Sequence, residues 1–159
     1  MSRHAEHCHS IVVPLPPESA FPLFTPAGER LWLAGWQPEF LHPVDGCTEV
    51  GMVFRTRHGG EETLWSCIEF APESHRIRYL RISPATRFVT LSVSCSEEAE
   101  GRTRVEVRYA MTALTAEGER MLEALTPLSF AATIDEWQEK ITLYVAQRET
   151  DTACLSSGA

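Results

Sequence analysis

Apolar and polar residues alternate in five consecutive segments over residues 50–111. A period of two is typical of strands that bury one face. The residues His-Gly-Gly-Glu at 58–61 predict a two-residue hairpin turn, because Gly-Gly supplies the positive φ angles that such turns demand. Pro72 and Pro84 mark the next two turns, and the last falls across 97–101. The pattern therefore predicts an antiparallel meander of five strands.

One choice of register brings the bulky residues of these strands onto a single sheet face. Phe54 then lies opposite Trp65, and Cys67 lies opposite Tyr79. Since a slip of one residue would turn a whole strand over, the agreement among the strands supports this register. We predict that this face lines an apolar space and contacts a ligand there. Its residues are Met52, Phe54, Trp65, Tyr79, Val89, Leu91, Val107, Tyr109 and Met111.

Two further pairings decide which residues face outward. The turn at Pro72 places Glu69 opposite Ile77, and the last hairpin places Val93 opposite Val105. The outer face then carries a second apolar group, which is consistent with a homodimer interface. This group consists of Leu64, Ile68, Phe70, Leu80 and Ile82.

The segments before the meander predict one strand and two short helices. A β-branched run makes residues 10–15 a first strand, which a cluster of prolines ends. Pro17 begins the first helix, because its missing N–H would have no partner in a first turn anyway. Thr25 and Pro26 repeat this start with a hydroxyl N-cap, so a second helix is expected over 26–33.

The C-terminal third is predicted to be helical. Thr115 caps a first stretch, and Thr126 restarts the helix, so we expect a break before Pro127. Beyond the break, apolar residues recur at intervals of four and three, as on one buried helix face. About 22 residues give roughly 33 Å of helix, which is enough to cross a sheet. The apolar stripe consists of Phe130, Ile134, Trp137, Ile141 and Tyr144.

The length of 159 residues bounds the organisation of the chain. A chain of this length buries roughly two thirds of its unfolded surface as one domain. The patterned segments extend over residues 10–149 and predict a single domain. We expect residues 1–9 to be flexible and residues 150–159 to form a disordered tail, because neither end has an apolar period.

The formal net charge of −8, from 22 acidic and 14 basic residues, disfavours nucleic acid and anionic lipid surfaces as partners. No apolar run is long enough to insert into a membrane, and the His-rich N-terminus lacks the apolar core of a secretion signal. We therefore expect a cytoplasmic protein.

The motifs predict neither a metal site nor a cofactor. The five cysteines show no C-x-x-C spacing, so buried, reduced thiols are expected. His4, His7, Cys8 and His9 carry metal-ligand atoms at close spacing, but short terminal clusters of this kind usually bind metal only incidentally. Phosphate-binding glycine loops, dinucleotide fingerprints and nucleophile elbows do not occur.

The order of the predicted elements and several local phrases resemble the START-related helix-grip proteins of the SRPBCC group. The phrases are PPESAFPLF, then FTPAGERLWLAGWQPEF, and a C-terminal helix that carries Trp137; the resemblance covers residues 10–148. It implies an α+β fold in which six to seven curved antiparallel strands wrap a long C-terminal helix, with an apolar cavity between them. The group includes the birch-pollen-allergen fold, polyketide cyclases and aromatases, and lipid-transfer domains, so the fold alone selects no single use.

Few ionisable residues fall on the cavity side of the predicted strands. Glu69 and Arg81 either neutralise each other, orient a polar ligand head, or lie exposed at strand ends. His58 and Glu61 flank the first hairpin, where they form either an acid–base pair at the cavity rim or a solvated turn.

The expected function is the binding of a small hydrophobic or aromatic molecule in this cavity. Tyr79 and Tyr109 either orient the ligand with their hydroxyls or pack in the core. Phe130, Ile134 and Trp137 are the helix residues expected to contact the ligand, Trp137 above all. Trp36 is expected to contact it as well, and Trp32 and Trp36 form the cavity mouth or plug it. Two alternatives stay open: a polyketide cyclase or dehydratase-type enzyme, which needs a titrating group in the cavity, and a chaperone-activator-like module that binds proteins through the outer face.

Overall fold

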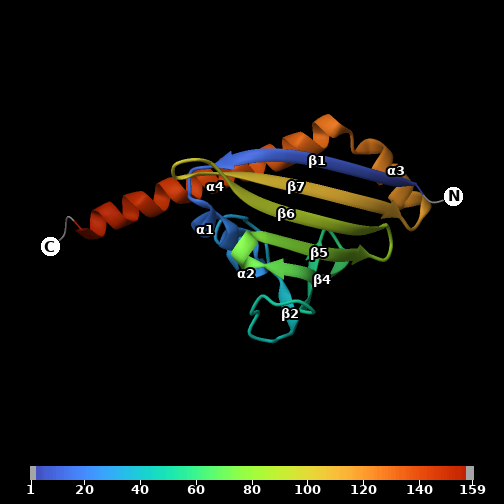
Figure 1. Ribbon diagram of the computed structural model, residues 1–159. Coiled ribbons are helices and arrows are strands. Elements are labelled where there is room, and N and C mark those ends of the chain that lie inside the picture. The colour runs from blue at the N-terminus through green and yellow to red at the C-terminus, as the bar shows by residue number, and fades with distance from the viewer. Residues whose placement is uncertain (1–2, 157–159) are drawn as a thin grey trace.

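The computed structural model describes residues 3–156, with side chains through residue 154. Seven antiparallel strands form one sheet in the order β1-β7-β6-β5-β4-β3-β2 (Figure 1), which confirms the predicted α+β helix-grip class. The short helices follow the first strand and the long helix comes last. The elements are β1 (His4–Val13), α1 (Pro17–Ala20), η1 (Phe21–Phe24), α2 (Pro26–Glu29), β2 (Glu39–His42), β3 (Val53–His58), β4 (Glu61–Ala71), η2 (Pro72–Ser74), β5 (Arg76–Ser83), β6 (Arg87–Ala99), β7 (Arg102–Ala113), α3 (Ala116–Ala124) and α4 (Pro127–Ser156).

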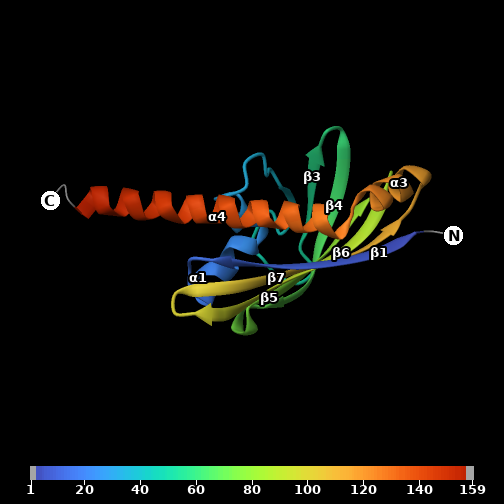
Figure 2. The same cartoon turned by 90° about the horizontal axis from the view of Figure 1, so that it is seen from above.

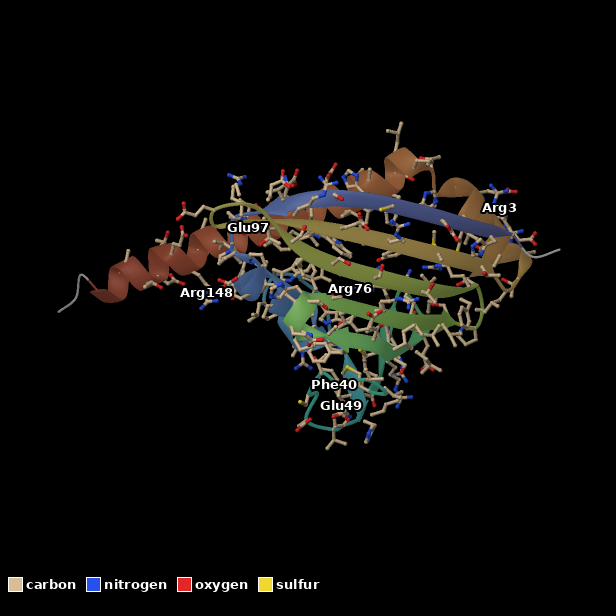
Figure 3. The ribbon with its side chains drawn as sticks, viewed as in Figure 1. Arg3, Phe40, Glu49, Arg76, Glu97 and Arg148 are labelled. Carbon is tan, nitrogen blue, oxygen red and sulfur yellow. The ribbon has the colours of Figure 1, made fainter. Side chains whose placement is uncertain are left out.

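The long helix α4 crosses one face of the sheet and then projects beyond it (Figures 1 and 2). Its 30 residues give about 45 Å of length. The predicted stripe packs inward, since Phe130, Ile134 and Ile141 are buried and Trp137 is half-buried against the core. Arg148 lies on the projecting part of the helix (Figure 3). The amphipathic period therefore identified the sheet-facing side of α4 correctly.

Strand pairing confirms the predicted register at the start of the meander. Phe54 pairs with Trp65, and Cys67 pairs with Tyr79. Figure 2 shows β3 and β4 rising away from the plane of the other strands, so the sheet curls around the helices. All nine residues predicted to share one face turn toward the interior: seven are buried, and Trp65 and Tyr109 are half-buried against the core.

A β-bulge overturns the predicted facing of the end of β4. The register shifts between Cys67 and Glu69, which leaves Ile68 without a partner in β5. One inserted residue reverses the alternation of side chains beyond it. Phe70 therefore packs into the core, whereas Glu69 lies on the outer face with its carboxylate 3.2 Å from the guanidinium of Arg76. The prediction that Glu69 faces the cavity is wrong.

The last hairpin is also longer than predicted. Val93 pairs with Val107 rather than with Val105, because β6 and β7 continue to a tight turn at residues 100–101. Gly101 has a φ of 71° there, which a glycine adopts without strain. Since the shift is two residues, each side chain keeps its predicted face.

The N-terminal segment is more ordered than its sequence indicates. β1 begins at His4, which pairs with Thr112, so the expected flexibility of residues 1–9 is wrong for the part that the structure describes. Helix α4 covers the inner side of this strand. The His7 ring stacks on an α4 ring with 5.3 Å between centroids, and the His9 ring lies 2.7 Å from an α4 carboxylate. These contacts involve polar rings, which an apolar pattern does not detect.

The described part of the C-terminal segment is also more ordered than expected. The described part of residues 150–159 continues α4 instead of forming a disordered tail. No glycine or proline interrupts residues 128–156. A helix that has already formed adds one hydrogen bond for each residue it fixes, so it extends until a breaker stops it.

Candidate ligand cavity

The space between the sheet and the helices contains three adjoining hollows. An inner cavity of about 130 Å³ adjoins one of about 290 Å³ beside α3 and α4 and one of about 320 Å³ beside the first hairpin. Arg81 lines all three, Tyr109 lines the first two, and Trp65 lines the first and third. The hollow that the sequence predicts is therefore present, and Arg81 lies at its junction.

Aromatic rings form the wall between the inner cavity and the hairpin side. The Trp36 ring meets Trp65 and Phe54 edge-on, with centroids 5.6 and 6.1 Å apart. Phe54 and Trp65 stack on each other at 5.4 Å. The Trp36 indole also donates a 2.8 Å hydrogen bond to the carbonyl of Pro26, which fixes its ring. Trp36 thus forms a wall of the mouth, whereas Trp32 is buried in the core and lines none of the three hollows.

The predicted contact residues divide into two groups. Three of them, Met52, Val89 and Val107, are fully buried in the packed core and line none of the hollows. The others line at least one hollow: Trp36, Phe54, Trp65, Tyr79, Leu91, Tyr109, Met111, Phe130, Ile134 and Trp137.

The two tyrosines differ in how their hydroxyls are used. The Tyr79 hydroxyl donates a 2.8 Å hydrogen bond to the carbonyl of Phe24, so it already has a partner. The Tyr109 hydroxyl has no hydrogen-bond partner among the described residues. Burial raises the pKa of Tyr109 while the positive charge of Arg81 lowers it, and burial has the larger effect. Tyr109 therefore keeps its proton and offers a hydroxyl to the cavity.

Besides Nε2 of His7, the buried side-chain polar atom that lacks a hydrogen-bond partner among the described residues belongs to Arg81. Its guanidinium carbon lies 5.4 Å from the Trp65 ring centroid and 5.5 Å from that of Tyr109. Its Nε is fully buried and has no hydrogen-bond partner. No carboxylate of the described residues lies within ion-pair distance of it. Since Glu69 is on the outer face beside Arg76 and Arg78, the alternative in which Glu69 and Arg81 neutralise each other is wrong.

Glu29 is a cavity residue that the sequence reasoning missed. It ends the short helix α2, whose Thr25 cap accepts a 3.0 Å hydrogen bond from Gly28. A Cβ at Gly28 would lie 1.9 Å from the carbonyl oxygen of Pro22, so only glycine allows this approach. The close approach brings Glu29 to the wall of the inner cavity. Its carboxyl has no partner among the described side chains, and burial raises its pKa well above the ordinary 4.5.

A second arginine lies beside the first. Arg87 lines the hollows on both sides of Arg81 and forms a 3.5 Å ion pair with Glu61. Burial and the positive charge of Arg81 both lower the pKa of Arg87. The sequence did carry a signal for it, since Arg87 lies two residues before Val89 in β6 and therefore points to the same face of the sheet.

His58 is exposed at the first hairpin and lines only the hollow of about 320 Å³ beside that hairpin.

Two other hollows lie outside this interior. One of about 310 Å³ is on the outer face, where Arg78 and Arg108 have Glu69 and Glu106 as ion-pair partners. The other, of about 530 Å³, lies between the first helices and the projecting end of α4. Neither contains a buried polar atom that lacks a partner. The interior around Arg81 is therefore the stronger candidate site.

The histidines near the N-terminus do not form a metal site in the described structure. Because side chains alternate along β1, His4 and Cys8 lie on the outer face and His7 and His9 turn toward α4. Within residues 3–156 no group of three or more His, Cys, Asp or Glu side chains is placed to hold a metal ion. None of the described helices is both long and apolar enough to span a membrane.

The fold is similar to that of several solved structures at low sequence identity. Norcoclaurine synthase from Thalictrum flavum, in complex with dopamine and hydroxybenzaldehyde, matches 92% of this chain with 88% of its own at a TM-score of 0.65 and 14% identity. A hypothetical protein from Helicobacter pylori matches 88% of this chain with 87% of its own chain, at a TM-score of 0.70 and 12% sequence identity. Ara h 8.0201 matches 90% of this chain with 95% of its own chain, at a TM-score of 0.61 and 14% sequence identity.

A scan against protein-family models and a search of curated proteins gave no match. The structural similarity extends over most of each chain, but at 12–14% identity it establishes the fold and nothing finer. The chain therefore has the helix-grip fold.

Proposed function

We propose that the protein reversibly binds a small hydrophobic or aromatic molecule in the hollows between the sheet and α4. The observation that carries this proposal is the aromatic lining of an interior that the chain does not fill. Burial of ligand surface there contributes roughly 25 cal/mol per Å² before the costs of ordering. Norcoclaurine synthase, which shares the fold, was solved with two aromatic molecules bound.

The lining supports an aromatic ligand in particular. Trp36, Trp65 and Tyr109 present ring faces and edges that hydrogen bonds or neighbouring rings hold in place. Rigid rings lose little conformational freedom when a ligand binds, and ring pairs contribute beyond their buried area. The two larger hollows, of 290 and 320 Å³, also have about the volume of small-molecule sites, which starts near 300 Å³.

The test uses the uncharged fluorescent probe N-phenyl-1-naphthylamine. We expect the probe to bind the wild-type protein saturably. Its affinity should fall about tenfold or more after Trp65→Ala or Tyr109→Ala, because each substitution removes a ring from the wall. Leu64→Ala is the matched control, since Leu64 precedes Trp65 in β4 and is exposed on the outer face. Equal affinity in all four proteins would reject the cavity, and native mass spectrometry of the purified protein would show any retained ligand.

A second candidate function is catalysis in the same cavity, of the polyketide cyclase or dehydratase type. It is favoured by Glu29, whose pKa burial raises well above 4.5, and by the hydroxyl-bearing Tyr109, which lines the same inner cavity. A carboxylic acid held neutral in an apolar site is suited to donate its proton to a carbonyl oxygen. The cationic Arg81 would stabilise the negative charge that develops on such an oxygen.

The titration of Glu29 decides whether this second candidate has a basis. Carbon-13 NMR of the Glu29 carboxyl should show a midpoint well above 4.5, and Glu29→Gln identifies the signal by removing it. A midpoint near the ordinary value would remove the acid that the reaction needs.

A further inference from the structure

The charges around the cavity do not balance. Two arginines, Arg81 and Arg87, face the hollows, and Glu61 is the one carboxylate within ion-pair distance of either among the described residues. Glu61 also accepts a 2.9 Å hydrogen bond from Thr86, which holds it on the Arg87 side. The other acidic group of the wall, Glu29, forms no ion pair with either arginine, and burial raises its pKa, which favours the uncharged carboxyl. One positive charge therefore has no counterpart.

This excess runs against the charge of the whole protein. The chain has a formal net charge of −8, and the other two arginines of β5, Arg76 and Arg78, have Glu69 as a carboxylate partner on the outer face. Arg78, three residues before Arg81 on the same strand, lies on the outer face beside Glu69. Strand β5 thus has an arginine with a carboxylate partner on its outer face, Arg78, and one without such a partner on its inner face, Arg81. A buried polar group that lacks a partner destabilises the fold unless something else satisfies it.

The position of the guanidinium identifies what would satisfy it. Arg81 lies over the rings of Trp65 and Tyr109, and its Nε is enclosed without an acceptor. No hydrogen bond or ion pair joins its terminal nitrogens to the described residues, and Arg81 lines all three hollows. A planar guanidinium in this setting matches a carboxylate, which accepts two parallel hydrogen bonds from it.

We propose that the molecule bound in the cavity is a small amphipathic carboxylate, with its anionic head at Arg81 and its apolar body among the rings. This inference rests on the proposed binding function and specifies the ligand class. The neighbouring Arg87 adds positive potential, and the Tyr109 hydroxyl offers a further donor to the same oxygens. The head could belong to an aromatic acid or to a fatty acid, since both present the same group to Arg81.

Calorimetric titration with three probes tests the proposal. The probes are 2-naphthoate, its uncharged analogue 2-naphthamide, and n-decanoate. We expect the affinity for naphthoate to exceed that for naphthamide about tenfold or more, because charge-assisted hydrogen bonds replace neutral ones. Tighter binding of naphthoate than of decanoate assigns the body to an aromatic acid, and the reverse order assigns it to a fatty acid.

Arg81→Met identifies the residue responsible, since methionine keeps an unbranched apolar stem over the rings and removes the charge. The preference for naphthoate over naphthamide should disappear in Arg81→Met and persist in Arg78→Met, the matched arginine of the outer face. A preference that survives Arg81→Met overturns the assignment. If that variant fails to fold, the affinities of the wild-type protein for naphthoate and naphthamide still decide whether the cavity prefers a carboxylate.

The outcomes separate this inference from the function on which it rests. Equal binding of naphthoate and naphthamide to the wild-type protein overturns the carboxylate preference and leaves the aromatic cavity intact. Absence of binding by all three probes and by N-phenyl-1-naphthylamine rejects both.

Discussion

Two regions under the same sheet are packed in different ways. Beneath β1 and β7, Ile11, Val13, Val105 and Ile141 are at most 2% exposed and border none of the three interior hollows. Toward β3 to β5, the space is bordered by half-buried rings, among them Trp65. Branched aliphatic side chains interlock and fill the first region, whereas flat rings that meet edge-on leave gaps in the second.

The polar groups follow the same division. The side chains named in the filled region are aliphatic, while the hollow region contains the Arg81 guanidinium and the Glu29 carboxyl, which have no partner among the described side chains. A further buried atom without a partner, Nε2 of His7, lies where β1 meets Phe130 of α4. Cores in which each polar group is satisfied are the rule, and exceptions concentrate at functional sites. The comparison therefore supports the proposal that a ligand occupies the hollow end of the interior, while the filled end holds the fold together.

The largest expected effect is on stability in the filled region. Ile141→Ala should lower the free energy of unfolding by about 3 kcal/mol, because it removes buried methyl groups and leaves a cavity. Leu33→Ala, at the wall of the inner cavity, should cost clearly less, since that side chain already borders empty space. Urea unfolding measures both, and equal losses would break the distinction between the two regions.

A smaller effect of opposite sign is expected at the junction of the hollows. Arg81→Met should raise the free energy of unfolding by about 1 kcal/mol without ligand, because it removes a partly buried charge whose Nε lacks an acceptor. The same urea measurement applies. A marked loss of stability would mean that Arg81 supports the fold rather than a ligand.

The third effect appears in the dependence of stability on pH. Burial raises the pKa of folded Glu29 above the 4.5 of an unperturbed carboxyl, so the folded protein keeps a proton that the unfolded chain releases. The wild type therefore loses stability as pH rises from 4.5 through the folded pKa, and Glu29→Gln does not. The free energy of unfolding of Glu29→Gln should therefore rise relative to that of the wild type as the pH is raised above 4.5. An unchanged difference would contradict the burial of Glu29.

The smallest effect is expected on the outer face. Glu69→Gln should change the free energy of unfolding by less than about 1 kcal/mol, since its pairs with Arg76 and Arg78 are accessible to solvent. Binding of N-phenyl-1-naphthylamine should not change either. A loss of probe affinity would place Glu69 in the site and contradict the register of β4.

The sequence was sufficient for the fold and for the ring side of the site. Alternation over β3 to β5 placed Phe54, Trp65 and Tyr79 correctly, because one-sided burial imposes a strict period. A single-residue bulge leaves no mark in composition, so Glu69 and Phe70, which follow Ile68, were assigned to the wrong faces. Glu29 was missed because a glutamate in a short helix is usually solvated, and only the approach of Gly28 to Pro22 turns it inward.

The most direct test of the hollow region is NMR of the nitrogen-15-labelled protein during titration with 2-naphthoate. The account predicts that the indole N–H signals of Trp36 and Trp65 and the Nε–H signal of Arg81 shift most. The indole N–H signal of Trp32 should shift least, because Trp32 is buried and its indole donates a hydrogen bond to the carbonyl of Leu23. Shifts confined to the outer face, or to the groove at the projecting end of α4, would contradict it.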